Sequence, residues 1–217
     1  MRRKYLRPTE TALALGAFCL AILVNLNASI YTAKVGAQAP YLHSDLLLNL
    51  LPRIDLFFLF VWGFFGFIVF ALTAGLTSEK RRIAYILWMY ALLIMLRSLF
   101  IILTPMSLPP EAVPRQGSGF FDLIGCHLTS GYDLFFSGHA AFPFLGYLLY
   151  KNHYVKLVFM AFSLTMALGI LLCKYHYSID ILGAYFITYA TVKAHQGHIE
   201  PAYKRFLDRL DSSGWIQ

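Results

Sequence analysis

Long apolar runs alternate with short polar segments along most of the chain. A helix needs roughly 20 apolar residues to cross a bilayer, and four of the runs have this length. The runs at 137–150 and 176–194 are shorter and reach it only with their polar ends. The pattern predicts an all-α fold, a polytopic membrane protein with six transmembrane helices in one bundle. The expected helices are 11–32, 54–76, 83–104, 137–150, 154–173 and 176–194.

Composition supports the membrane interpretation. The chain of 217 residues is 59% hydrophobic and only 13% charged, which excludes a soluble domain of this size. We expect a single integral-membrane domain over 1–217, with a short cytoplasmic tail at 196–217. The basic start of the chain precedes an apolar run that is too long for a cleaved signal peptide. The three cysteines show neither metal spacing nor a disulfide framework, so no metal and no cofactor are expected.

The net charge of +7 follows from the arrangement of the basic residues. Thirteen of the 18 Lys and Arg residues fall on one side of the predicted bundle. By the positive-inside rule this side is cytoplasmic, so both termini are expected to be inside, and no nucleic-acid partner is needed to explain the charge. The thirteen are Arg2, Arg3, Lys4, Arg7, Lys80, Arg81, Arg82, Lys151, Lys156, Lys193, Lys204, Arg205 and Arg209.

Two histidines open the shorter helices. Segments 137–150 and 176–194 both run from outside to inside, so His139 and His176 are predicted to lie at the same depth on the outer face. Asp180 follows His176 by four residues, a spacing that places both side chains on one face of a helix. It could accept a hydrogen bond from one ring nitrogen of His176 and leave the other to attack a substrate.

Further residues near the same face favour a phosphate ligand. The starts of both short helices offer unpaired N–H groups and positive dipole ends. Ser137 can cap the first of them, and Gly138 allows a ligand close to the backbone. Arg97, inside an apolar helix, and Lys174 add positive charge. Other readings stay open: Arg97 could pair with Asp133 or Asp55, Lys174 could extend its ammonium to the interface, and the histidine–aspartate pair could relay protons.

At this point the sequence resembles a known family, the type 2 phosphatidic acid phosphatase superfamily, and more closely its sphingomyelin synthase-like branch. The resemblance rests on "GYDLFFSGHA" at 131–140 and "HYSIDILGAYF" at 176–186, with support from "RSLFIILTPMSLP" at 97–109 and "LPRIDL" at 51–56. It covers about 50–195.

The resemblance implies six helices and an active site on the outer face. It also implies a phosphohistidine intermediate, in which His176 attacks phosphorus, Asp180 orients it and His139 protonates the leaving alkoxide. Residues of the two blocks and their neighbours are then expected to bind substrate, namely Arg97, Asp133, Ser137, Gly138, Lys174 and Tyr177.

Several positions depart from the family pattern. Gly131 replaces a family cysteine, and Gly169 and Ile170 stand where the phosphatases carry a Ser-Arg phosphate clamp. Lys174 and Tyr175 replace the His-Asp pair that synthase members often have. A lysine cannot reproduce the bidentate fork of an arginine. The missing clamp favours headgroup transfer over simple phosphate release.

The expected function is therefore that of an integral-membrane lipid phosphotransferase that uses membrane lipids as substrate and acceptor. The alternative is a lipid phosphate phosphatase that acts on phosphatidic acid-like substrates. A transporter with a His/Asp proton relay is a further alternative, although its polar groups would be expected at mid-membrane. A non-catalytic lipid-binding scaffold is the last. The short chain fits a bacterial inner-membrane protein whose site faces the periplasm or the outside.

Overall fold

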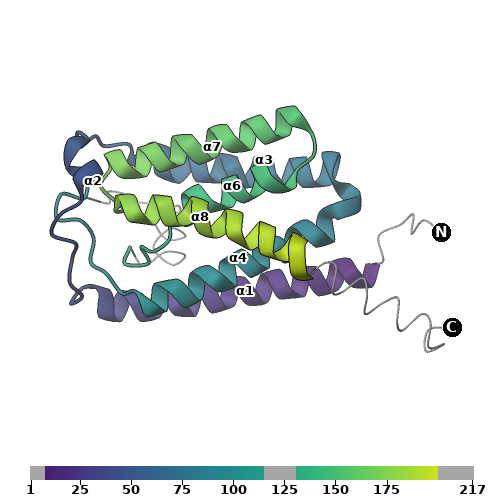
Figure 1. The fold of residues 1–217 in the computed structure, drawn as a ribbon, viewed down its shortest axis with the longest axis horizontal. Helices are drawn as coiled ribbons and strands as arrows, with labels where there is room; N and C mark the ends of the chain where they lie inside the picture. Colours follow the sequence, from purple (N-terminus) through teal and green to yellow (C-terminus); the bar gives the residue numbers. More distant parts are fainter. Residues whose placement is uncertain (1–7, 115–130, 200–217) are drawn as a thin grey trace.

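The computed structural model describes residues 8–114 and 131–199, and both ranges are helical apart from connecting turns and loops (Figure 1). The helices longer than ten residues are α1 (Pro8–Gly36), α3 (Phe64–Ser78), α4 (Ile83–Leu103), α6 (Gly138–Leu149), α7 (His153–Leu172) and α8 (Ser178–Ala194). The shorter elements are α2 (Leu46–Leu50), the π-helix η1 (Leu59–Gly63), the 3₁₀-helix η2 (Lys80–Arg82) and the π-helix η3 (His195–Ile199). The predicted cytoplasmic tail beyond residue 199, and the loop residues 115–130 with His127, lie outside the described residues.

The helices pack as a bundle with α6 at its centre. α1 lies along α4 on one side, whereas α6 packs against α7 and α8 (Figure 1). The contact between α6 and α7 is close because Gly146 has no side chain: a Cβ atom there would lie 2.5 Å from the ring of Phe159. The buried Ser163 hydroxyl of α7 also donates a hydrogen bond to the carbonyl of Ala140 in α6, at 2.9 Å. The core therefore fixes α6, the helix whose second residue is His139.

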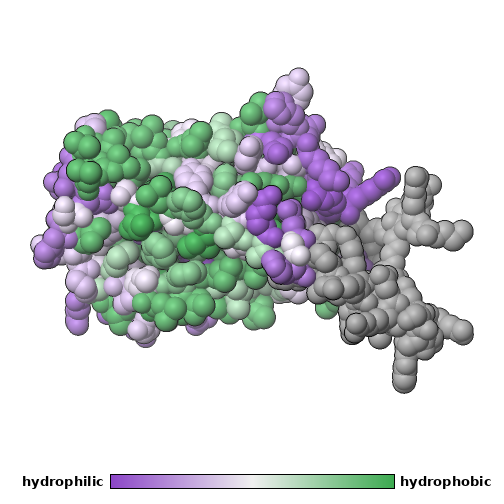
Figure 2. Space-filling model, viewed as in Figure 1, coloured by the Kyte–Doolittle hydropathy of each residue, from purple (hydrophilic) through white to green (hydrophobic). Residues whose placement is uncertain are grey.

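The apolar helices fit an integral membrane protein. Four described helical segments are long and apolar enough to cross a membrane. Figure 2 shows apolar surface over the middle of the bundle and hydrophilic residues toward its ends. These four segments are Thr9–Gly36, Leu59–Ser78, Lys80–Leu103 and His153–Leu172.

The two remaining long helices are shorter than a bilayer is thick. At 12 and 17 residues, α6 and α8 extend over about 18 and 26 Å, whereas the hydrocarbon core is about 30 Å thick. The six-span topology consequently stays a prediction. Non-helical backbone at membrane depth is tolerated where protein covers it, and residues 133–137 before α6 are almost all buried.

The predicted start of the second helix at Ile54 is wrong. Regular α/π geometry begins only near Phe57, whose N–H donates to the Asp55 carboxylate at 3.0 Å. Ile54 and Leu56 instead donate their N–H groups to the Leu172 carbonyl and to Cys173 Sγ, at 2.9 and 3.2 Å. Because these groups bond to the end of α7, the segment forms a strap across it rather than a helical turn.

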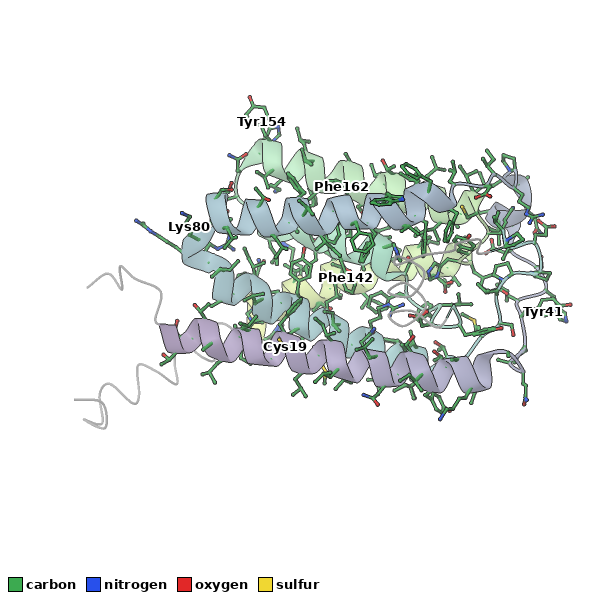
Figure 3. The ribbon with its side chains drawn as sticks, turned by 180° about the vertical axis from the view of Figure 1, so that it is seen from behind. Cys19, Tyr41, Lys80, Phe142, Tyr154 and Phe162 are labelled. Carbon is green, nitrogen blue, oxygen red and sulfur yellow. The ribbon has the colours of Figure 1, made fainter. Side chains whose placement is uncertain are left out.

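The two ends of the bundle differ in chemistry. We call the end with Lys80–Arg82 the basic end and the opposite end, which carries α2, the site end. Figure 3 shows Lys80 and Tyr154 at the basic end and Tyr41 at the site end. α1 begins and α8 ends at the basic end (Figure 1), as the predicted orientation requires. The membrane side of each end, and of the termini, stays a prediction.

Candidate active site

His176 and Asp180 meet, but not on one helix as predicted. α7 ends at Leu172 and α8 begins only at Ser178, so His176 lies in the turn between them. Asp180 is the third residue of α8, and its carboxylate accepts a hydrogen bond from the backbone N–H of Tyr177 at 3.0 Å. The same Oδ2 atom lies 3.1 Å from Nδ1 of His176. Helix capping, rather than helical periodicity, therefore brings the two side chains together.

This geometry pairs Nδ1 of His176 with Asp180, so Nε2 is the ring nitrogen that could act on a substrate. Asp180 is completely buried, with 0% exposure, and a carboxylate can only accept from Nδ1–H. Its backbone carbonyl also accepts from the N–H of Ser137 at 3.2 Å, which joins the starts of α6 and α8. Such a carboxylate-oriented imidazole is suited to act as a nucleophile or a general base.

His139 lies in the first turn of α6 between aromatic rings. Its imidazole stacks on Phe60 with ring centres 4.2 Å apart and contacts the ring of Phe64 at 4.4 Å. His139 and His176 line the same small cavity of about 20 Å³, which has room for about one water molecule. The other lining residues are Phe60, Arg97, Gly131, Asp133, Leu134 and Tyr175. The two histidines therefore face one space, as the sequence predicts.

Arg97 reaches this cavity from α4, and protein acceptors surround its guanidinium. Nη2 donates to the Asp133 carbonyl at 2.8 Å and to its carboxylate at 3.1 Å. Nε donates to the Phe136 carbonyl at 3.1 Å, and Nη1 donates to Oδ1 of Asn25 in α1 at 3.0 Å. The pairing of Arg97 with Asp133, one of the alternatives from the sequence, is thus present. Arg97 holds the non-helical segment that leads into α6.

Gly138 makes room for this approach. A Cβ atom at Gly138 would lie 3.3 Å from Nε of Arg97 and 3.1 Å from the ring of Phe142. Both distances are tighter than ordinary contacts, so a side chain would make the guanidinium and the ring give way by a few tenths of an ångström. The close approach predicted at Gly138 is therefore made by an arginine of the protein, which carries the positive charge to the helix N-terminus.

Ser137 precedes α6 but does not cap it. Its side chain makes no capping hydrogen bond, contrary to the prediction. Within the described part of the chain, the buried Oγ of Ser137 and the buried Oδ1 of Asp180 have no hydrogen-bond partner. A buried hydroxyl without a partner costs about 1–3 kcal/mol. Neither residue is among those that line the small cavity, and a buried polar atom without a protein partner calls for an explanation, such as a bound water molecule or ligand.

The start of α8 is already occupied by carboxylates. Asp45 accepts from the N–H and the hydroxyl of Ser178, at 2.6 and 2.8 Å. Burial raises the pKa of the Asp45 carboxyl, but hydrogen bonds from Leu48 and Ser178 outweigh it and hold the pKa below its ordinary value. The predicted anion site at this helix start is therefore filled by the protein itself.

Lys174 and Tyr177 lie on the other side of the turn from the small cavity. The Lys174 ammonium donates to the carbonyls of Leu48 and of Leu51, the latter at 2.8 Å. The Tyr177 hydroxyl donates to the Ser107 carbonyl at 3.0 Å and accepts from the N–H of Leu42 at 3.1 Å. Both side chains line a second cavity of about 130 Å³. The structure thus does not bring them together with Arg97 and His139.

Sequence reasoning missed Asn25, Asp45 and the aromatic pair Phe60 and Phe64. An asparagine in an apolar helix is a signal that could have found Asn25, since such a residue normally has a partner helix. Asp45 begins a short turn and carries no motif. The phenylalanines lie in a run of similar residues, so nothing in the sequence distinguishes them. In the described ranges, no three His, Cys, Asp or Glu side chains form a group that could hold a metal ion.

A comparison with protein-family models matches the segment that carries both histidines of the small cavity. Residues 132–196 match a family model described as PAP2 superfamily C-terminal. The match includes His139, His176 and Asp180 and leaves the preceding helices unmatched. No curated protein and no solved structure matches the chain significantly. The match does not show the sphingomyelin synthase-like branch. It supports the type 2 phosphatidic acid phosphatase superfamily as the family to which this segment is similar.

Proposed function

We propose that the protein is a membrane enzyme that transfers the phosphoryl group or phospho-headgroup of a lipid through a phosphohistidine. The observation that carries the proposal is the contact of 3.1 Å between Asp180 Oδ2 and His176 Nδ1, beside a cavity that His139 also lines. The family match supports a lipid phosphatase or phosphotransferase type of activity. Known members of the superfamily act on phosphate esters of lipids, which fits a site at the end of an apolar bundle.

The first half-reaction uses both histidines. The Nε2 lone pair of His176 attacks phosphorus, a P–N bond forms, and the P–O bond to the leaving alkoxide breaks. The alkoxide takes a proton from the protonated imidazole of His139, so a neutral alcohol leaves. Asp180 holds the Nδ1 proton of His176 and stabilises the positive charge that the ring gains.

The second half-reaction reverses these roles. The oxygen of an acceptor attacks phosphorus, the P–N bond breaks, and His139 removes the acceptor's proton. A lipid alcohol as acceptor gives a new phospholipid, whereas water gives free phosphate or phospho-headgroup. The N–H groups at the start of α6 and the nearby Arg97 would stabilise the negative charge on the phosphorus oxygens.

Headgroup transfer to a lipid alcohol is the first candidate, because the resemblance to the synthase-like branch and the Gly169–Ile170 pair both favour it. Release of phosphate from a phosphatidic acid-like lipid is the alternative. Both reactions share the first half-reaction and differ only in the acceptor. Membrane lipids are thus the proposed substrates in either case.

A panel of labelled phospholipids tests the proposal. Purified protein is incubated with each lipid, with and without diacylglycerol or ceramide, and the products are separated. A new labelled lipid that requires the added alcohol indicates transfer, whereas free phosphate or free phospho-headgroup indicates hydrolysis. No product from any lipid would contradict the proposed activity.

The side of the membrane is tested with two exposed serines, Ser44 at the site end and Ser78 at the basic end. We propose that the site end faces the periplasm or the outside. A cysteine introduced at Ser44 should then react with an impermeant thiol reagent in intact cells, and one at Ser78 should not. Labelling at Ser78 alone would reverse the orientation.

A further inference from the structure

The short helix α2 is attached to the turn that carries His176, far away in sequence. At its start, Asp45 Oδ1 accepts the N–H of Leu48 at 3.0 Å, as an N-cap does. The same carboxylate accepts the two hydrogen bonds from Ser178 described above. One buried side chain therefore holds the first turns of both α2 and α8 (Figure 1).

The other end of α2 is attached to the same turn through Lys174. The carbonyls of Leu48 and Leu51 lie in the last turn and at the C-cap of α2, where the Leu48 carbonyl also accepts a hydrogen bond from the N–H of Leu51 at 3.3 Å. The Lys174 ammonium donates to both of them. Lys174 is only 1% exposed, and Glu111, 3.9 Å away, is the one carboxylate in an ion pair with it among the described residues. Its side chain is thus committed to α2.

Lys174 has a backbone conformation that is unusual for a lysine. Its φ of 59° is in the left-handed region, where glycine is favoured. The N–H groups of Lys174 and Tyr175 donate to the carbonyls of Leu171 and Ile170, at 3.1 and 3.0 Å, which is the usual way for a helix to end at such a residue. Glycine would suit this backbone better, so the side chain of Lys174 needs another explanation.

His176 lies between the two points of attachment. Only three residues separate Lys174 from Ser178, and the hydroxyl of Tyr177, one of the three, is itself hydrogen-bonded to residues 42 and 107. The strap at Ile54 and Leu56 holds the preceding residues, at the end of α7. The backbone of His176 is therefore held from both sides, while its imidazole faces Asp180 and the small cavity.

We propose that Asp45, α2 and Lys174 form a clamp that positions His176 for attack, and that Lys174 is a positioning residue rather than a phosphate ligand. The proposal rests on the function proposed above. It explains why a lysine stands at a position that favours glycine: the ammonium of Lys174 attaches the end of α2 to the turn that carries His176. Residues of the clamp touch neither substrate nor the reacting atoms.

Lys174→Gly is the test, because glycine accepts the backbone conformation and removes only the side chain. Two quantities are measured: hydrogen–deuterium exchange of the peptide that spans 173–180, and the kcat and KM for a p-nitrophenyl phosphodiester. We expect faster exchange and a kcat lower by about 10²-fold, the usual cost of a misplaced reacting group, with KM changed less than threefold. Lys151→Gly, at an exposed non-helical lysine of the basic end, is the matched control and should change neither.

Asp45 gives an independent check through a conservative pair. Asp45→Asn keeps one oxygen for the N-cap of α2 but puts an NH₂ donor where Oδ2 accepts the Ser178 N–H, so its kcat should fall between wild type and Asp45→Ala, which should behave like Lys174→Gly. Wild-type exchange and kcat in Lys174→Gly would overturn the clamp. Faster exchange with an unchanged kcat would overturn its role in positioning. If wild-type protein turns over no substrate, the proposed function fails, whereas exchange in the two variants still decides whether the clamp exists.

Discussion

The starts of α6 and α8 are joined by the hydrogen bond from the Ser137 N–H to the Asp180 carbonyl, yet their first turns are occupied in opposite ways. At α8, the carboxylates of Asp45 and Asp180 accept the N–H groups of Ser178 and Tyr177. At α6, Ser137 offers no capping bond, and the guanidinium of Arg97 approaches Gly138. A helix start filled by the protein's own carboxylates no longer attracts an anion, whereas one beside a guanidinium does.

The difference indicates that two similar helix starts have different roles, one in orienting His176 and one in facing a phosphate. The start of α8 is an orienting device, because its capping carboxylate also fixes Nδ1 of His176. The start of α6 is the surface against which a phosphate would lie, with His139 in its first turn. Each prediction below removes one feature of this division.

Removal of the nucleophile has the largest expected effect. His176→Ala should abolish turnover of every substrate, whatever its leaving group, because no phosphohistidine can form. The protein should still fold, since the capping bond from Tyr177 to Asp180 does not involve the imidazole. Turnover is measured against His43→Ala, a change at an exposed histidine of the same end that should leave activity unchanged. Residual activity above about 1% of wild type would exclude His176 as nucleophile.

Loss of the acid should depend on the leaving group. His139→Ala should slow an alkyl lipid ester by about 10²–10⁴-fold, the usual range for general acid catalysis. A p-nitrophenyl ester needs little protonation and should lose much less. The measurement is rate against leaving-group pKa in wild type and variant. Equal losses on both kinds of ester would show that His139 does not act as the acid.

Arg97→Lys should cost less, about 10–10²-fold in kcat. Lysine keeps the charge near α6, but a point-like ammonium cannot reach Asn25, Phe136 and Asp133 in the directions of the guanidinium. Exchange of the peptide that spans 131–138 should also rise, because Arg97 holds this segment. Arg53→Lys, at an exposed arginine of the site end, is the matched control. Unchanged activity in Arg97→Lys would show that catalysis does not require the guanidinium.

Ser137→Ala should have the smallest effect. It should leave the stability unchanged or raise it, while it weakens substrate binding. The buried hydroxyl has no partner among the described residues, so its loss should leave thermal stability unchanged or raise it by up to about 1 kcal/mol. If the hydroxyl binds phosphate, KM should still rise several-fold. Ser163→Ala removes a buried hydroxyl that donates to Ala140 and should lower stability instead. An unchanged KM in Ser137→Ala would show that the hydroxyl does not contact substrate.

Much of the fold could be predicted from hydropathy alone. The helices at 83–103 and 153–172 agree with their predicted bounds within one residue, because both are continuous apolar runs. The error at Ile54 arose because the strap there is as apolar as a helix. Its N–H groups bond to α7, and such long-range partners leave no local pattern.

Of the predicted site residues, Arg97, Asp133, His139 and His176 line one cavity, whereas Lys174 and Tyr177 line another, and their roles stay predictions. Residue spacing suggested the meeting of His176 with Asp180, although the contact depends on an N-cap rather than on a helical turn. The prediction for Lys174 followed from charge alone. A charge shows that a partner exists but not which one, and the partners of Lys174 are carbonyls of a helix more than 120 residues away in the chain.

The central claim is that His176 carries the phosphorus. The most direct measurement is to quench the enzyme during turnover of a ³²P-labelled phospholipid, under conditions that preserve acid-labile phosphohistidine, and to map the label by mass spectrometry. The account predicts label on His176 in wild type, retained in His139→Ala and absent in His176→Ala. Label on His139, or turnover with no labelled histidine in any variant, would contradict it.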